Sequence, residues 1–187
     1  YCSNRTQHFR GQLSTYEEYI QRYDFTRLSE IQRKKTQSYW KKSLDGYEAL
    51  NFPYDNARLS APQFKSKKYE IDFDLNTTVA LESLCAANSA TLYMGLMTIF
   101  CFLLMRYTGQ NDLILGTPVC NRADPKFEHT IGLFVNSLVV RLKLQKNASF
   151  LDALATVKEE MLQGLEHQNL PFEKLVELIS PERTIGK

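Results

Sequence analysis

The sequence lacks the residue patterns that would assign a chemistry directly. Its three histidines, His8, His129 and His167, are dispersed, and none has a cysteine or carboxylate at metal-ligand spacing, so no zinc site is expected. None of them belongs to a recognised nucleophile arrangement, so no self-contained catalytic triad is expected either. Gly109 and Gly116 lack the spacing of a phosphate-binding loop, which leaves nucleotide binding without support.

Cysteine is scarce and irregularly spaced. Of the four cysteines, Cys85 and Cys101 lie inside apolar segments, where thiols behave as small hydrophobic side chains. Cys120 follows an apparent strand without any local signature of an activated thiol. With neither a disulfide framework nor a secretory signal peptide, we expect a fold without bridges and a cytoplasmic location.

Strong net charge and long apolar runs are absent as well. The net charge of +2 over 187 residues is too small to indicate nucleic-acid binding. The most apolar stretch, Leu92 to Met105, is shorter than the roughly 20 residues that cross a bilayer, so it predicts a buried helix and no membrane partner. Basic residues gather at Arg33-Lys34-Lys35 and Lys41-Lys42. They indicate a solvated helix face or, as the alternative, a docking patch for an anionic partner.

The remaining composition, with 43% hydrophobic and 24% charged residues, is typical of one globular domain. Hydrophobic periodicity predicts the order helix, strand, helix, helix, strand, strand, helix, helix, which indicates an α/β lobe with helices packed on a mixed β-sheet. Imperfect alternation over 133–144 indicates a bulge or burial on both faces. The expected helices cover 16–44, 79–85 with a cap at Asn76, 92–107, 150–165 and 172–179, and the expected strands cover 68–73, 112–119 and 133–144.

Four segments together resemble the motifs of one protein family. The first is Ser38-Tyr39-Trp40 followed by Leu44, and the second combines 103–110 with Gly116-Thr117-Pro118 and Asn121-Arg122. The third, 131–141, begins Ile-Gly-Leu-Phe-Val-Asn and ends in arginine, and the fourth, 167–173, reads His-Gln-Asn-Leu-Pro-Phe-Glu. In this order they resemble the C-terminal lobe of nonribosomal peptide synthetase condensation domains, members of the chloramphenicol acetyltransferase-like superfamily.

The resemblance implies part of an enzyme. It assigns residues 1–187 to the C-terminal lobe, with 1–37 as a weakly matched lead-in and the N-terminal lobe absent. The family carries His-His-x-x-x-Asp-Gly on that other lobe, and no two histidines are adjacent in this chain. Condensation domains form an amide when an aminoacyl acceptor on one carrier protein attacks an acyl or peptidyl thioester on another. We therefore expect no activity from the chain alone, and the alternative is a noncatalytic lobe that docks carrier proteins or acts as a scaffold.

Two site residues follow from the resemblance, and neither is catalytic. Arg122 matches the arginine expected to form a salt bridge across the lobe interface with the aspartate of the missing motif, a role that suits a permanently charged, bidentate donor. A surface arginine at a strand end is the alternative. Asn136 resembles a tunnel-lining asparagine of the family, although an asparagine that satisfies a bulge fits the same pattern.

The implied cofactors and partners are those of a multidomain synthetase. No cofactor or metal is expected to bind directly, because the substrates are carried on the 4'-phosphopantetheine of carrier proteins. The expected partners are the N-terminal lobe, peptidyl carrier proteins and an adjacent adenylation domain, without nucleic acid or membrane. His167, near the end of an expected helix, is predicted to interact with the last helix carbonyls rather than to act in catalysis.

Overall fold

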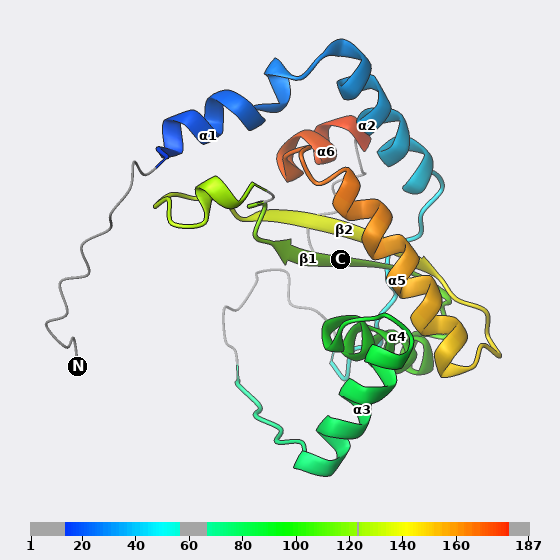
Figure 1. The fold of residues 1–187 in the computed structure, drawn as a ribbon. Coiled ribbons are helices and arrows are strands. Elements are labelled where there is room, and N and C mark those ends of the chain that lie inside the picture. Colours follow the sequence, from blue (N-terminus) through cyan, green and yellow to red (C-terminus); the bar gives the residue numbers. More distant parts are fainter. Residues whose placement is uncertain (1–13, 57–66, 123, 180–187) are drawn as a thin grey trace, which may run out of the picture.

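A two-stranded antiparallel sheet lies at the centre of the lobe, with helices around it (Figure 1). The computed structural model describes residues 14–56, 67–122 and 124–179. Helix α5 packs on strand β2 and on helix α4, α3 packs on α4, and α6 contacts both α2 and β2. The expected α/β lobe with packed helices is therefore confirmed. Among the described residues its sheet has two antiparallel strands, so it is smaller than the sequence predicts and not mixed. The elements are α1 (Tyr16–Tyr23), η1 (Phe25–Arg27), α2 (Glu30–Ser43), α3 (Leu75–Ala87), α4 (Leu92–Thr108), β1 (Asp112–Val119), η2 (Pro125–Phe127), β2 (Asn136–Lys143), α5 (Phe150–Glu166) and α6 (Phe172–Ile179), where η denotes a 3-10 helix.

The register of the sheet is continuous. Asp112 lies opposite Lys143 at one end and Val119 lies opposite Asn136 at the other, with consecutive partners between them. No bulge interrupts β2, so of the two alternatives for this segment, burial on both faces is correct. Val140, Arg141 and Leu142 are buried in succession. The strand begins at Asn136 rather than at the predicted residue 133.

The single helix predicted over 16–44 was wrong, because the chain turns between α1 and α2. Asp24 ends α1, and its carboxylate accepts a hydrogen bond from the backbone N–H of Thr26 at 2.8 Å. Ser29 then begins α2 with a capping box, in which its hydroxyl accepts from the N–H of Gln32 at 3.2 Å. Short polar side chains that bond nearby backbone compete with a continuing helix, and the apolar spacing does not reveal this.

The strand predicted over 68–73 was also wrong: within the described part of the chain, no other segment pairs with it. Its alternating apolar side chains are exposed, with Tyr69 at 86% and Ile71 at 78% of their full accessibility. A strand needs a neighbour to satisfy its backbone groups, and none of the described segments supplies one. The next helix, α3, is capped by Asp74 rather than by Asn76, and the Asp74 carboxylate accepts from the N–H of Thr77 at 2.9 Å.

The other predicted helices form close to their expected bounds. Thr91 caps α4, which ends at Gly109 in the left-handed conformation with φ of 71°, where glycine avoids the steric cost of a side chain. Ser149 and Asp152 form a capping box at the start of α5. Among the described helices none is by itself long and apolar enough to span a membrane, although α3 and α4, bent by 104°, pass such a test as a pair.

The apolar side chains form two separate clusters. The main core joins α2, α4, α5, α6 and both strands, and it includes Cys101, Leu142 and Val157. A smaller aromatic cluster of Tyr19, Phe127 and Phe134, with Tyr16 and Tyr23 beside it, holds α1 against the segment that precedes β2. Burial raises the pKa of the Cys101 thiol to about 12, as expected for a hydrophobic thiol, and the described cysteines form no disulfide.

Candidate functional site

Asn136 joins the third and fourth sequence motifs. Its Nδ2 donates to the carbonyl oxygens of Gln168 at 2.8 Å and Leu170 at 3.0 Å. Its Oδ1 accepts from the backbone N–H groups of Ser137 at 2.9 Å and Phe172 at 3.2 Å. The first residue of β2 therefore fixes the turn that leads into α6. Because the register has no bulge at this point, the bulge interpretation of Asn136 was wrong, and its amide instead connects two segments distant in sequence.

His167 has a structural position. It is the C-terminal capping residue of α5 and is buried. Its ring stacks on Tyr39 with centroids 4.1 Å apart, and its carbonyl accepts from Nε1 of Trp40 at 3.2 Å. Burial, together with the positive charge of Lys35, lowers the pKa of its imidazole. These contacts connect the first motif to the fourth, and they make His167 an anchor between α2 and α5.

An open groove lies beside Asn136. It has a volume of about 400 Å³ and runs between α1, the segment before β2, and the start of α6. Aromatic side chains form much of its walls, and the amides of three asparagines reach it. We call it the tyrosine groove. Its lining includes Tyr16, Tyr19, Tyr23, Asn121, Asn136 and Asn169.

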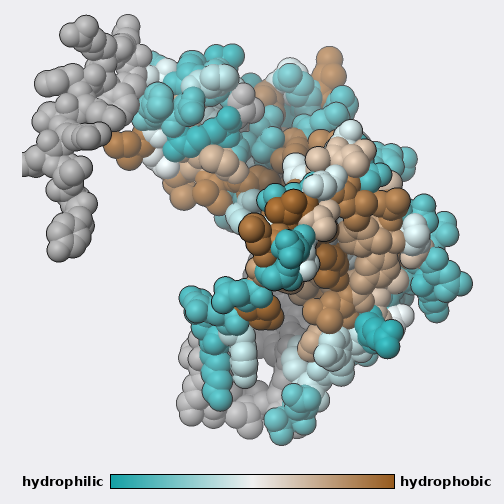
Figure 2. Space-filling model, turned by 60° about the horizontal axis from the view of Figure 1, so that its bottom comes forward, coloured by the Kyte–Doolittle hydropathy of each residue, from teal (hydrophilic) through white to brown (hydrophobic). Residues whose placement is uncertain are grey.

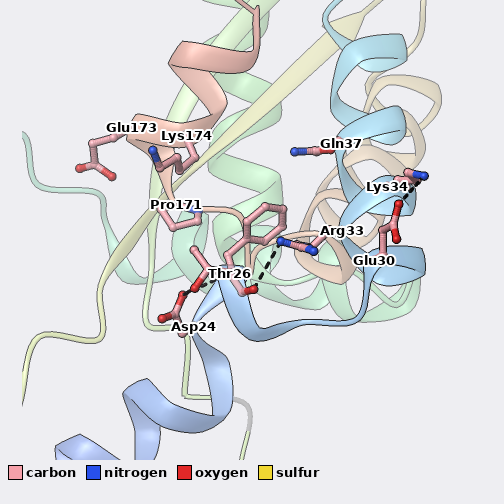
Figure 3. A pocket seen from close by; sticks show the side chains of 10 residues that line it. Asp24, Thr26, Glu30, Arg33, Lys34, Gln37, Pro171, Glu173 and Lys174 are labelled. Atoms are coloured by element: carbon pink, nitrogen blue, oxygen red, sulfur yellow. Dashed lines mark hydrogen bonds and ion pairs between the residues drawn. The ribbon is translucent and has the colours of Figure 1, made fainter.

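A second groove, of about 510 Å³, shares part of this lining. Arg33 and Gln37 project into it from α2 on one side, and Pro171 and Lys174 lie on the other side (Figure 3). Arg33 donates to the carbonyl of Thr26 at 3.4 Å. Both grooves include Pro171, so the two hollows meet at the proline of the fourth motif. This places the motif at a surface that a ligand or another polypeptide can reach.

Arg122 lies three residues beyond β1 and follows Asn121, which lines the tyrosine groove. Its Nη1 donates to the carbonyl oxygens of Phe127, Glu128 at 3.3 Å and Thr130 at 2.8 Å. Its guanidinium carbon lies 3.6 Å from the centroid of the Phe134 ring, a favourable cation–π arrangement. Among the described residues it forms no ion pair, and Asp124, two residues on, is paired with Arg22 at 3.3 Å. The arginine is thus fixed by neutral groups, and no carboxylate of the described residues pairs with its charge.

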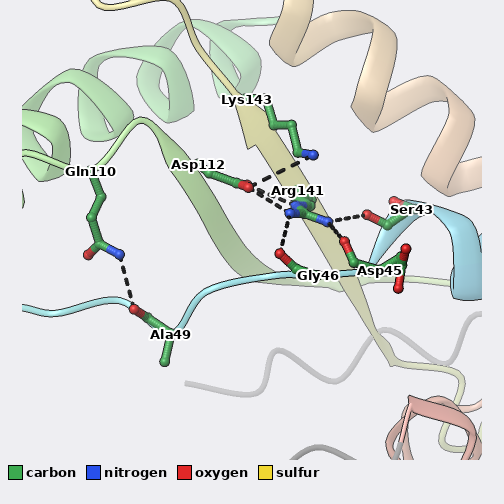
Figure 4. Close-up of polar contacts among 8 residues, drawn as sticks. All are labelled: Ser43, Asp45, Gly46, Ala49, Gln110, Asp112, Arg141 and Lys143. Atoms are coloured by element: carbon green, nitrogen blue, oxygen red, sulfur yellow. Dashed lines mark hydrogen bonds and ion pairs between the residues drawn. The ribbon is translucent and has the colours of Figure 1, made fainter.

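Arg141, which ends the third motif, has a role that the sequence analysis missed. Figure 4 shows its guanidinium between Asp112 and the turn that follows α2. It forms a bidentate pair with Asp112 at 2.8 and 2.6 Å and donates to the carbonyl oxygens of Ser43 at 3.0 Å, Asp45 at 2.6 Å and Gly46 at 3.1 Å. This bonding lowers the pKa of the Asp112 carboxyl. The one available signal was an arginine inside an otherwise apolar strand, which requires a buried partner.

Two titratable side chains that line the grooves, Tyr19 and Asp24, have shifted pKa values. Burial raises the pKa of Tyr19, and the neighbouring Tyr16 and Tyr23 add to this effect, so its hydroxyl stays protonated near neutral pH. Hydrogen bonds from Thr26 lower the pKa of the Asp24 carboxyl. In the part of the chain that the structure describes, no group of histidine, cysteine and carboxylate side chains could hold a metal ion. The described residues of the two grooves supply aromatic walls, the amides of asparagines, and the charged side chains of Arg33 and Lys174.

Exposed apolar side chains border the site and cover a second face. Ile131, at 95% exposure, Leu133 and Val135 alternate along the segment that leads into β2. Helix α4 exposes Leu96, Ile99, Phe100, Leu103 and Tyr107. Figure 2, in which the lower part of Figure 1 is turned forward, shows hydrophobic side chains gathered over the middle of this side. Neighbouring exposed apolar side chains of this kind are typical of surfaces that contact further polypeptide.

Solved structures share this fold. The X-domain in a complex of the X-domain and OxyB from teicoplanin biosynthesis superposes with a TM-score of 0.79 and 25% identity, over 92% of this chain and 38% of that chain. The first condensation domain of the CDA synthetase gives a TM-score of 0.73 and 21% identity, over 95% of this chain and 39% of that one. These similarities define the class: the chain has the chloramphenicol acetyltransferase-like fold of condensation-type lobes.

The family follows from the sequence comparisons. The model of the Condensation domain family matches residues 1–186, and the chain belongs to this family. It is 36% identical to tyrocidine synthase 3 of Brevibacillus parabrevis over 154 residues, 82% of this chain and 2% of that protein. It is 35% identical to phosphinothricin tripeptide synthetase PhsC of Streptomyces viridochromogenes, over 79% of this chain and 14% of that protein. The chain thus spans a small part of the curated relatives it matches.

Proposed function

We propose that this chain is the C-terminal lobe portion of a nonribosomal peptide synthetase condensation domain and helps to form amide bonds between carrier-bound substrates. The observation that carries the proposal is the junction at Asn136, where two family motifs meet in the wall of a groove. Family membership over residues 1–186 supports the same reaction class. The donor is an acyl or peptidyl thioester and the acceptor is an aminoacyl group, each on the 4'-phosphopantetheine of a carrier protein.

The reaction joins the acceptor amine to the donor carbonyl. The amine nitrogen forms a bond to the thioester carbon, the carbon–sulfur bond breaks, and the departing thiolate takes up the proton that the amine loses. The imidazole that handles this proton belongs to the His-His-x-x-x-Asp-Gly motif of the other lobe. The described part of this chain contributes the groove walls, which the hydrogen bonds of Asn136 fix in place, and these walls position an extended substrate arm. By itself the chain is inactive in this proposal.

Arg122 is the proposed link to the other lobe. Its charge has no carboxylate partner among the described residues, and the exposed side chains of Ile131, Leu133 and Val135 lie in the segment beside its stacking partner Phe134. A charged donor with an apolar border fits an interface that becomes dry when the lobes meet, where one guanidinium–carboxylate pair fixes the relative position. The aspartate of the absent motif is the proposed partner.

The test uses the complete condensation domain with carrier-bound donor and acceptor. Arg122→Ala should reduce the rate of amide formation at least tenfold and lower the stability by about 2 kcal/mol, because charge-assisted hydrogen bonds and the interface pair are lost. Arg27→Ala, at an exposed arginine of η1 outside the four motifs, is the matched control and should leave the rate unchanged. Unchanged turnover and unchanged melting in Arg122→Ala would count against the assignment.

A noncatalytic docking lobe is the second candidate. It is favoured by the likeness to the X-domain, which was solved in complex with OxyB. In that case the complete domain would bind its partner while it forms no amide from carrier-bound substrates. The same amide-formation assay with the unmodified domain separates the two candidates, since measurable product favours the enzyme.

A further inference from the structure

Positive charge is concentrated on α2. The helix has five basic residues and one acidic residue, so its formal charge is +4, whereas that of the whole chain is +2. Four of these residues are exposed lysines, and among the described residues only Lys34 has an ion-pair partner, Glu30 at 2.6 Å. Lysines near a helix C-terminus interact favourably with the helix dipole. This accounts for Lys41 and Lys42 and not for Lys35, which lies in the middle of the helix.

The exposed residues of α2 form one stripe. Ile31, Lys35, Ser38 and Lys42 follow at intervals of four, three and four residues, which places them along one side of a helix. Ile31 is 81% exposed, and a β-branched residue is a weaker helix former than the alternatives at a solvated position. A solvated face explains the lysines, and the exposed isoleucine at the head of the stripe adds an apolar side chain to the same side of the helix. A contact surface explains both.

The stripe is held on a rigid support. On the opposite side of α2, Thr36 and Trp40 are buried, and Trp40 donates to the carbonyl of His167 at 3.2 Å. The capping box at Ser29 fixes the first turn. Lys35 and Lys42 are seven residues apart, which corresponds to about 10 Å along the axis. The charges are therefore presented at a spacing that a second helix can match with carboxylates at i and i+7.

We propose that this stripe docks an acidic amphipathic helix of a partner polypeptide. Carboxylates of the partner pair with Lys35 and Lys42, and an apolar side chain one turn beyond them covers Ile31. Each exposed ion pair contributes little by itself and is screened by salt, so the apolar contact supplies specificity and the charges speed association. This surface is distinct from the tyrosine groove, and the docking does not require amide formation.

The probe is a fluorescein-labelled helical peptide with glutamates seven residues apart and one leucine a turn away, titrated with the full chain by fluorescence anisotropy at low salt. Lys35→Glu/Lys42→Glu should weaken binding at least tenfold, and Ile31→Ser should weaken it several-fold without any change in charge. The control Lys67→Glu/Lys146→Glu alters two exposed lysines elsewhere by the same total charge and should bind as the unmodified chain does. Circular dichroism verifies that each variant remains folded.

Three results would overturn the proposal. Equal weakening by the control pair would mean that only net charge matters. No effect of Ile31→Ser would remove the apolar half of the contact. Tighter binding of a 12-base-pair DNA duplex than of the peptide, at equal salt, would assign the stripe to nucleic acid. Amide formation by the complete domain is measured separately, so the proposed function stays testable whichever of these three results is found.

Discussion

Arg141 and Arg122 both lie in family motifs, yet the structure places them in opposite situations. The Arg141 side chain is 5% exposed and is neutralised by a bidentate pair with Asp112, with three carbonyl oxygens completing its contacts. Arg122 is bound by carbonyl oxygens and an aromatic face, without a carboxylate among the described residues. The charge of Arg141 is therefore neutralised within the fold. The charge of Arg122 is available to a carboxylate of a partner.

An arginine in a family motif can therefore stabilise the fold from within or contact another part of the protein, and its burial distinguishes the two roles. A buried guanidinium must find its partner within the fold, because an unpaired charge in a low-dielectric environment is costly. A half-buried one retains solvent contact and tolerates a missing carboxylate. Stability measurements on the chain therefore report on Arg141, whereas the interface role of Arg122 is visible only when the other lobe is present.

The largest expected effect is that of Arg141→Ala. It leaves Asp112 without its partner and removes donors from the turn after α2, so the free energy of unfolding should fall by about 3–5 kcal/mol. Chemical denaturation monitored by Trp40 fluorescence measures the loss. Arg141→Ala/Asp112→Ala should recover part of it, because the uncompensated carboxylate is gone. If Arg141→Ala cost no more than Arg122→Ala, the contrast between the two arginines would fail.

Asn136→Ala should have an intermediate effect. The substitution leaves the carbonyl oxygens of Gln168 and Leu170 and the N–H of Phe172 without their partner, at an expected cost of about 1–3 kcal/mol. Asn147→Ala, at an exposed turn residue, serves as the control and should cost less than about 0.5 kcal/mol. Hydrogen exchange at Phe172 should accelerate in the first variant alone, and equal exchange in both would exclude a specific role for the Asn136 amide.

The smallest expected effect is a pH dependence that originates at His167. Burial lowers its pKa in the folded chain, so below about pH 6.5, the usual value for an unfolded histidine, the unfolded state binds more protons. Stability should therefore fall as the pH is lowered from 7.5 to 5.5. His167→Asn should flatten this dependence, whereas His129→Asn, at an exposed histidine, should retain it. A melting temperature with the same pH profile in all three proteins would contradict the assignment.

Local signals in the sequence predicted much of the secondary structure. The cap at Ser149 and the stripe that follows it predicted α5, and the short apolar run over 112–119 predicted β1 at its observed bounds. The break near Asp24 was missed because apolar spacing continues across it, while a carboxylate–backbone hydrogen bond of 2.8 Å turns the chain. The strand over 68–73 was predicted from alternation alone, and alternation does not provide the neighbouring strand.

The sequence predicted which motifs form the candidate site but not which of their residues contact one another. The resemblance singled out Arg122 and Asn136, whose proposed roles at an interface and in a tunnel stay predictions. It gave no reason to expect that Asn136 would bond to the turn after α5, or that Arg141 would bind the end of α2. Such contacts join residues about 30 to 100 positions apart, and no local pattern encodes a pairing at that separation.

The sequence by itself determined where α4, α5 and α6 begin and end and to which family the chain belongs, because caps, periodicity and motif order act over short distances. Only the tertiary structure decided which motif residues meet, which arginine is neutralised and which apolar faces stay uncovered. These outcomes depend on the packing of distant segments, and the burial of charged and polar groups selects among the arrangements that local structure allows.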